Sequence, residues 1–163
     1  MPRIPFDELP ADARLWIFPA SRALTEEERG RVLAETDAFI DQWTAHGVPL
    51  SAARDIRHGQ FVLVGVNERA AGVSGCSVDA LVRRMGHLQS ALGVEFTNNA
   101  PVLFRSGAKI ERVPRERFAE LAANHEVGPD TVVFDNTIES VDDVRSGRWE
   151  VRAADAWHAR AFF

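Results

Sequence analysis

The stretch Gln60–Val66, QFVLVGV, constrains the fold of this chain more than any other. Its residues Phe61–Val64 are apolar at every position, which is typical of a strand buried on both faces. The preceding stretch Ser51–Arg57 also favours a strand. His58-Gly59 between them suits a tight turn, because Gly adopts positive φ freely and His tolerates it better than branched residues do. We therefore predict a β-hairpin whose second strand lies inside the protein.

Two helices are predicted on either side of this hairpin. The first begins at Thr25, which forms a capping box with Glu28, and is expected to continue to a stop at Gly47. The second runs from about Ser77 to Leu92, where apolar residues recur at helical spacing, and Gly93 is expected to end it.

The remaining elements complete a mixed order. Their expected bounds are a strand at Arg14–Phe18, a hairpin at Pro101–Arg105 and Lys109–Val113, a helix from Pro114, and a strand at Thr131–Phe134. The order is strand, helix, hairpin, helix, hairpin, helix, strand. It favours an α+β fold with about three helices packed on a mainly antiparallel sheet. A doubly wound sheet is the alternative, but the strict strand–helix alternation that it requires is absent.

The length of 163 residues fits one domain that spans residues 1–163. Its last part, about 148–163, is a tail rich in aromatic residues, among them Trp157, Phe162 and Phe163. We expect this tail to dock on the body of the domain, because large aromatic side chains resist exposure to water.

The composition narrows the class of protein. Hydrophobic residues make up 45% and charged residues 26% of the chain, an ordinary balance for a globular protein. The net charge of −5 argues against binding nucleic acid over a broad face. No apolar run approaches the roughly 20 residues of a membrane span, and the N-terminus lacks the apolar core of a signal peptide. We expect a cytoplasmic protein without a membrane anchor.

The only cysteine, Cys76, lies in the stretch SGCSVD, where a loop meets the second predicted helix. A helix N-terminus favours the thiolate, so Cys76 is a candidate nucleophile. The same geometry at Gly72–Ser77 suits a small anionic ligand, with Ser74, Gly75 and Ser77 as candidate binding residues. A third interpretation makes Cys76 a small buried filler.

Catalysis by a cysteine needs a base and an orienting group. His158, in the aromatic tail, and His46 are the candidate bases, and Asp79 is the candidate orienting group. Metal binding lacks support, because neither H-x-x-x-H nor H-E-x-x-H occurs and there is no second cysteine. We therefore predict no metal site and no cofactor.

Four parts of the sequence carry a resemblance to a known family: FDELP with ARLW, then QWTAHG, SGCSVD and WHAR, in this order over nearly the whole chain. Together they resemble a family of small uncharacterised bacterial proteins that often carry the label "ABC transporter ATPase". The resemblance matches the chain at the candidate residues above and adds Trp43 and Trp157 as candidate ligand-binding residues. The label implies ATP hydrolysis, which we reject because the chain lacks a G-x-x-x-x-G-K-[ST] loop.

Three hypotheses for the function follow. We favour a non-catalytic module that binds a small anionic ligand or a protein partner, because no second catalytic residue is fixed by spacing. The first alternative is an enzyme that uses Cys76 with a histidine for acyl or thiol transfer. The second is a structural or interaction protein without a ligand, such as a homodimer.

Overall fold

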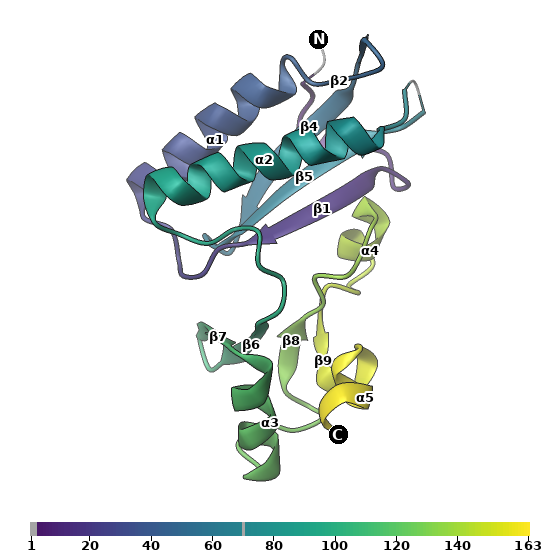
Figure 1. The fold of residues 1–163 in the computed structure, drawn as a ribbon. Helices are drawn as coiled ribbons and strands as arrows, with labels where there is room; N and C mark the ends of the chain where they lie inside the picture. Colours follow the sequence, from purple (N-terminus) through teal and green to yellow (C-terminus); the bar gives the residue numbers. More distant parts are fainter. Residues whose placement is uncertain (1–2, 70) are drawn as a thin grey trace. The chain divides into compact units, whose positions relative to one another are not determined.

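The computed structural model describes residues 3–69 and 71–163 and confirms an α+β fold with antiparallel sheets (Figure 1). The chain is organised as two compact units, and the single domain expected from the sequence stays a prediction. Unit 1 holds the described residues up to Thr97 together with Glu139–Asp142. Unit 2 holds Asn98–Ile138 and Asp143–Phe163.

Unit 1 is built on a three-stranded sheet of order β1-β5-β4. Its strands are β1 (Arg14–Pro19), β4 (Ser51–Arg57) and β5 (Phe61–Asn67). The hairpin predicted around His58 and Gly59 is confirmed, since both residues have positive φ, 56° and 63°. The central strand β5 is buried from Phe61 to Val66, as its unbroken apolar run predicts.

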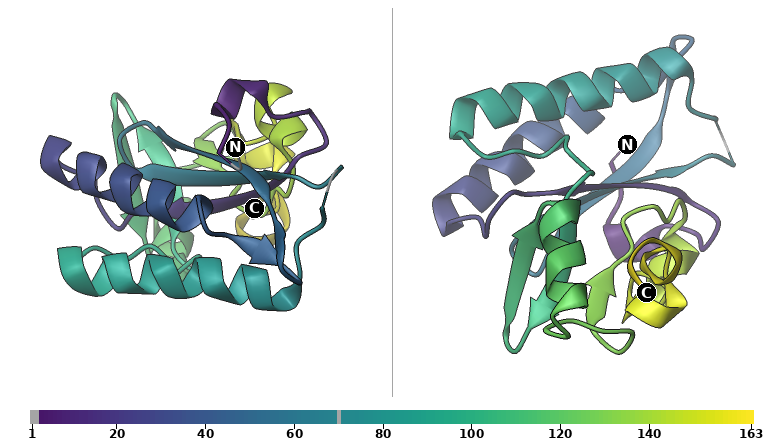
Figure 2. Two further views of the ribbon diagram at one scale, coloured as in Figure 1. Left: turned by 90° about the horizontal axis from the view of Figure 1, so that it is seen from above. Right: turned by 60° about the horizontal axis from the view of Figure 1, so that its bottom comes forward.

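Two long helices, α1 (Glu26–Ile40) and α2 (Gly75–Leu92), lie side by side over one face of the unit 1 sheet (Figure 2). Alternate residues of a strand point to the same face. On β5 these are Val62, Val64 and Val66, which join a core cluster with buried residues of both helices. Among the described residues, no helix is long and apolar enough to cross a membrane.

The other face of β5 is covered by short segments of unit 1. Gly65 faces this side, and a Cβ at this position would lie only 2.5 Å from Leu9 Cδ1 and 3.5 Å from Val141 Cγ2. Leu9 directly follows the 3-10 helix η1 (Phe6–Glu8), and both Leu9 and Val141 are buried. Glycine at residue 65 therefore lets this cover approach the sheet closely.

The first helix differs from the prediction at its C-terminal end. α1 begins at the predicted capping box but ends at Ile40 rather than near Gly47. Two short strands follow, β2 (Thr44–Ala45) and β3 (Val48–Pro49), paired antiparallel. Their turn contains His46 and Gly47 at positive φ, 52° and 79°. Gly47 therefore lies in the turn of a hairpin. The sequence alone does not distinguish this role from a helix stop, because both use the left-handed backbone conformation.

Unit 2 is built on a four-stranded sheet of order β7-β6-β8-β9. Its strands are β6 (Val102–Ser106), β7 (Lys109–Val113), β8 (Val132–Phe134) and β9 (Glu150–Arg152). The predicted hairpin of β6 and β7 is confirmed, with Gly107 in its turn at φ 62°. Pro114 is the residue that caps the next helix rather than its first residue.

The helices of unit 2 are short. They are α3 (Arg115–Ala123), α5 (His158–Phe162), the 3-10 helix η2 (Ala153–Asp155) and the last part of α4 (Val141–Arg145), which begins in unit 1. α3 and α5 pack on each other through aromatic rings, with the Phe118 and Phe162 centroids 4.8 Å apart. The aromatic tail thus packs against the core of unit 2.

Candidate functional site

Cys76 lies in the first turn of α2, in unit 1, and its side chain is exposed. The interpretation of Cys76 as a small buried filler is therefore wrong. Among the described residues, the Cys76 thiol makes no hydrogen bond to a histidine or to any other group. Its role as a nucleophile stays a prediction.

The loop before α2 already bonds several of its own N–H groups. The Val73 N–H donates to the Glu68 carboxylate at 3.2 Å. The N–H of Ser74 donates to Ser77 Oγ at 2.6 Å, and that of Ser77 donates to Ser74 Oγ at 3.1 Å. A carboxylate and two hydroxyl groups thus occupy donors that an anion would need. Anion binding by Gly72–Ser77 stays a prediction, and the geometry gives it no support.

Three further candidate residues, Trp43, His46 and Asp79, belong to unit 1. Buried Trp43 donates its indole N–H to the Ser77 carbonyl at 2.8 Å, which anchors the first turn of α2. His46 is exposed in the turn between β2 and β3, and β2 contacts α2. Asp79 is exposed on α2 and has no hydrogen bond or ion pair with described residues. Trp43 therefore has a structural role here.

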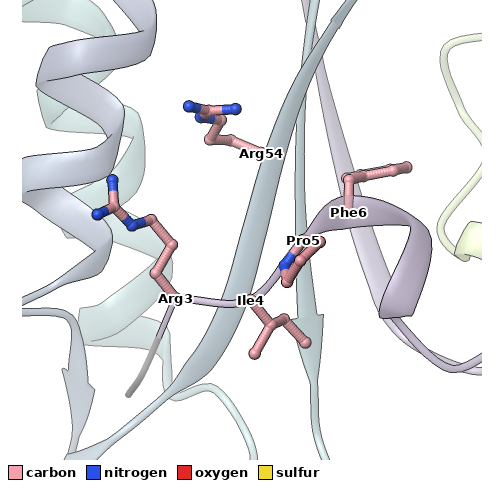
Figure 3. Close-up of a pocket in the computed structure, with 5 residues that line it drawn as sticks. All are labelled: Arg3, Ile4, Pro5, Phe6 and Arg54. Atoms are coloured by element: carbon pink, nitrogen blue, oxygen red, sulfur yellow. The ribbon is translucent and has the colours of Figure 1, made fainter.

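A cavity of about 270 Å³ lies beside the N-terminal segment of unit 1 (Figure 3). Its lining consists of Arg3, Ile4, Pro5, Phe6 and Arg54. Figure 3 shows the guanidinium groups of Arg3 and Arg54 extending toward the same helix. Both pair with Asp37 of α1, at 2.7 and 2.8 Å. Their charge is already compensated, so this cavity has no free cation to recruit an anion.

A second cavity of unit 1, about 360 Å³, lies between α1 and β4. Its polar groups are likewise engaged. Arg29 donates to the Leu24 carbonyl at 3.0 Å, Arg54 pairs with Asp37, and Asp55 accepts from the Ile56 N–H at 2.9 Å. Neither cavity of unit 1 is lined by a buried polar atom that lacks a partner.

A third cavity, of about 180 Å³, lies wholly within unit 2. It has an apolar wall and several polar groups, and its lining consists of Asn99, Pro101, Val102, Leu103, Arg115, Phe134, Asn136, Thr137, Trp157 and His158. Polar and apolar residues contribute about equally to this lining, and convergent polar groups beside apolar side chains are a feature of small-molecule sites.

His158 is the most unusual residue of this cavity. It is 1% exposed, yet its Nδ1 has no hydrogen-bond partner within residues 3–69 and 71–163. The ring stacks on Trp157, with the two centroids 3.9 Å apart, and meets the edge of Phe118 at 6.3 Å. An unpartnered buried nitrogen costs free energy, because water bonds it in the unfolded chain. Such a group calls for an explanation, and His158 is a residue of this cavity's lining.

The electrostatic surroundings keep this imidazole neutral. The pKa of His158 is lowered from 6.5 to about 4 by three causes together: burial, the largest, lowers it, the Asp135 carboxylate raises it, and the Arg115 guanidinium lowers it. The ring is therefore uncharged near pH 7. A neutral imidazole offers one N–H donor and one acceptor nitrogen.

Arg115, the first residue of α3, is the cation of this cavity. Its Nε donates to the Ala100 carbonyl at 3.0 Å, and its guanidinium carbon lies 4.7 Å from the Trp157 ring centroid. Among the described residues Arg115 forms no ion pair. Asn136 accepts from the Trp149 indole N–H at 2.9 Å, which leaves its NH₂ group available to a ligand.

The structure brings Trp157 and His158 together, as neighbours in sequence and in one cavity, and places the other candidates in unit 1. Sequence analysis missed Arg115, Asn99, Asn136 and Thr137. No spacing signals them, because they come from three separate segments that meet only in the folded unit. The only local signal was the position of Arg115 directly after Pro114, where the third helix was predicted to begin.

Among the described residues, no group of three or more His, Cys, Asp or Glu side chains is arranged to hold a metal ion. The unit 2 cavity offers nitrogen, amide and hydroxyl groups but no carboxylate in its lining. Comparisons with protein-family models, with curated proteins and with solved structures found no match for this chain.

Proposed function

We propose that this protein binds a small polar molecule in the unit 2 cavity lined by Arg115, Trp157 and His158. The observation that carries the proposal is buried His158, a residue of the cavity lining whose Nδ1 has no hydrogen-bond partner among the described residues. A bound molecule supplies the missing partner and removes the cost of leaving this nitrogen unsatisfied.

The size of the cavity supports a small occupant. A volume of about 180 Å³ corresponds to roughly six water molecules of liquid. Leu103, Phe134 and Trp157 supply an apolar wall, and Arg115 and Asn136 supply donors. The occupant is therefore a molecule of a few non-hydrogen atoms that has both polar and apolar parts.

Binding fits these groups better than catalysis. His158 is a weak base, because its pKa is lowered to about 4. The Thr137 hydroxyl already donates to Asp135, and the cavity has no cysteine, serine or lysine in its lining. We therefore extend the favoured hypothesis of a non-catalytic binding module to this cavity.

The test uses the four tryptophan indole N–H resonances of the full ¹⁵N-labelled chain. Trp157 lines the cavity and Trp149 donates to Asn136 in its lining, whereas Trp16 and Trp43 lie in unit 1. A library of small polar fragments is titrated into the protein. We expect some fragments to shift the Trp157 and Trp149 resonances saturably and to leave Trp16 and Trp43 in place.

The same spectra separate this site from the loop before α2. Trp43 bonds to Ser77, so a ligand at Gly72–Ser77 would shift the Trp43 resonance instead. His158→Phe, which keeps an aromatic ring beside Trp157, should weaken the binding of fragments that carry a hydrogen-bonding partner for the imidazole, and exposed His87→Phe should not. No shift of Trp157 with any fragment, or shifts of Trp43 alone, would refute the proposal.

A further inference from the structure

We propose that the ligand of the unit 2 cavity is a small carboxylate that carries a hydroxyl group, with the carboxylate at Arg115 and the hydroxyl at His158. This inference rests on the proposed binding function and names the class of molecule that it concerns. Three properties of the cavity lead to it: its single cation, its neutral buried nitrogen, and the way one ring holds both.

Arg115 selects the carboxylate. Its Nε is committed to the Ala100 carbonyl, and the two terminal nitrogens of the guanidinium have no bond to described residues. This pair matches the two oxygens of a carboxylate in a bidentate arrangement. An amine is disfavoured, because the lining contains a cation and no acidic side chain. One guanidinium balances one negative charge, so a monoanion fits better than a phosphate dianion.

His158 selects the hydroxyl. The neutral ring presents Nδ1 either as a donor or as an acceptor, depending on which nitrogen carries the proton. A hydroxyl group both donates and accepts, so it satisfies Nδ1 in either tautomer. A second charged group at this depth would instead lose its hydration without a counter-charge, because the side chain of His158 is 1% exposed.

Arg115 and His158 both pack on Trp157 and line the same cavity. The guanidinium carbon of Arg115 lies 4.7 Å from the Trp157 ring centroid and the imidazole of His158 lies 3.9 Å from the same point. Arg115 is exposed and His158 is buried, so the ligand enters with its charge toward water and its hydroxyl inward. This orientation avoids burying the charge.

The experiment compares four probes on the full chain, followed through the Trp157 and Trp149 indole resonances. Lactate has both groups, propionate lacks the hydroxyl, lactamide lacks the charge, and inorganic phosphate carries a different anion. We expect lactate to bind about tenfold more tightly than propionate or lactamide, the ratio expected of one hydrogen bond that satisfies a buried group. Inorganic phosphate should bind more weakly than lactate.

Two variants assign the groups. Arg115→Gln should weaken lactate and propionate alike by about tenfold or more, the loss expected for a charge-assisted pair, and exposed Arg117→Gln on the same helix should weaken neither. His158→Phe should reduce lactate binding to the level of propionate and leave propionate unchanged. Because Arg115 is exposed, its variant tests the proposal even where His158→Phe fails to fold.

The outcomes separate the two proposals. If other fragments bind at Trp157 but lactate has no advantage over propionate or lactamide, or phosphate binds best, the hydroxycarboxylate class is refuted and the cavity keeps its binding function. If no molecule shifts Trp157, the binding function itself fails. If Arg115→Gln leaves lactate binding intact, the assignment of the carboxylate is wrong.

Discussion

The two units treat their buried polar groups differently. In unit 1, buried Gln60 donates to the Ala20 carbonyl at 3.1 Å and buried Trp43 donates to the Ser77 carbonyl at 2.8 Å. In unit 2, buried His158 lines a cavity, and its Nδ1 has no hydrogen-bond partner in the described part of the chain. Gln60 and Trp43 are thus satisfied within unit 1, whereas in our proposal a bound molecule satisfies His158.

One hydroxyl of unit 1 tests this contrast. Buried Thr36 Oγ1 also lacks a partner, but Thr36 lies within α1 and lines none of the three cavities described above. No external group reaches it by way of these cavities. The comparison teaches that an unsatisfied polar atom indicates a site only where space for a partner lies beside it.

The largest expected effect separates the stabilities of the units. Phe118 is fully buried in unit 2 and contacts Phe104, His158 and Phe162. Phe118→Ala should lower the free energy of unfolding of unit 2 by about 3–5 kcal/mol. In a urea titration, the Trp149 and Trp157 resonances should then disappear at lower urea, with the midpoint for Trp16 and Trp43 unchanged. An equal shift of all four would show that the units unfold together.

Acid should weaken unit 2 through His158. Its pKa is about 4 in the folded protein, mainly through burial, against 6.5 when unfolded, so the unfolded chain binds the proton first. The stabilisation is complete above pH 6.5 and is lost as the pH falls toward 4, by about 3 kcal/mol in total. His158→Phe should flatten this part of the pH profile of unit 2. Wild-type and variant profiles that run parallel between pH 6.5 and 4 would contradict the buried, neutral histidine.

A glycine of unit 1 should resist substitution. In Gly65→Ala the new Cβ would meet Leu9 Cδ1 at 2.5 Å, so the cover of the sheet must shift, at a cost of about 1–3 kcal/mol. Gly86→Ala is the control, because nothing lies within 4 Å of its Cβ and alanine favours the helix by about 0.5–1 kcal/mol. The urea midpoint of unit 1, followed through the Trp16 and Trp43 resonances, measures the effect of both substitutions. A neutral Gly65→Ala would mean that Leu9 moves aside freely.

The smallest expected effect concerns the cap of α2. Ser74→Ala removes the oxygen that accepts from the Ser77 N–H and should lower the free energy of unfolding of unit 1 by about 1 kcal/mol. Exposed Ser90→Ala in the same helix should change it by less than about 0.5 kcal/mol. Equal effects of the two substitutions on the urea midpoint would show that the cap does not contribute to the stability of unit 1.

Local signals predicted much of the fold. The Thr25–Glu28 capping box, the His58-Gly59 turn and the Gly93 stop act through bonds within a few residues, and all three are confirmed. Gly47 was assigned to the wrong element, because positive φ serves a hairpin turn and a helix end alike. The division into two units had no signal in composition.

The candidate site was accessible to sequence analysis only in part. His158 and Trp157 were singled out, but the burial of His158 depends on Phe118, which lies forty residues earlier in the chain. Arg115 and Asn136 reach the cavity through the packing of α3 and of the segment after β8, which no local pattern encodes. Cys76 attracted attention by being unique, yet uniqueness in composition does not determine the neighbours of a side chain.

The way Arg115 is held has a further consequence for recognition. A free arginine side chain gives up about 2 kcal/mol of rotamer entropy when it is immobilised. Here the Ala100 carbonyl and the Trp157 ring restrict the guanidinium before any molecule arrives, so part of that entropy is already spent during folding. The side chain is therefore preorganised. A lysine at residue 115 lacks the planar guanidinium, so its side chain would lose this conformational entropy each time a ligand binds.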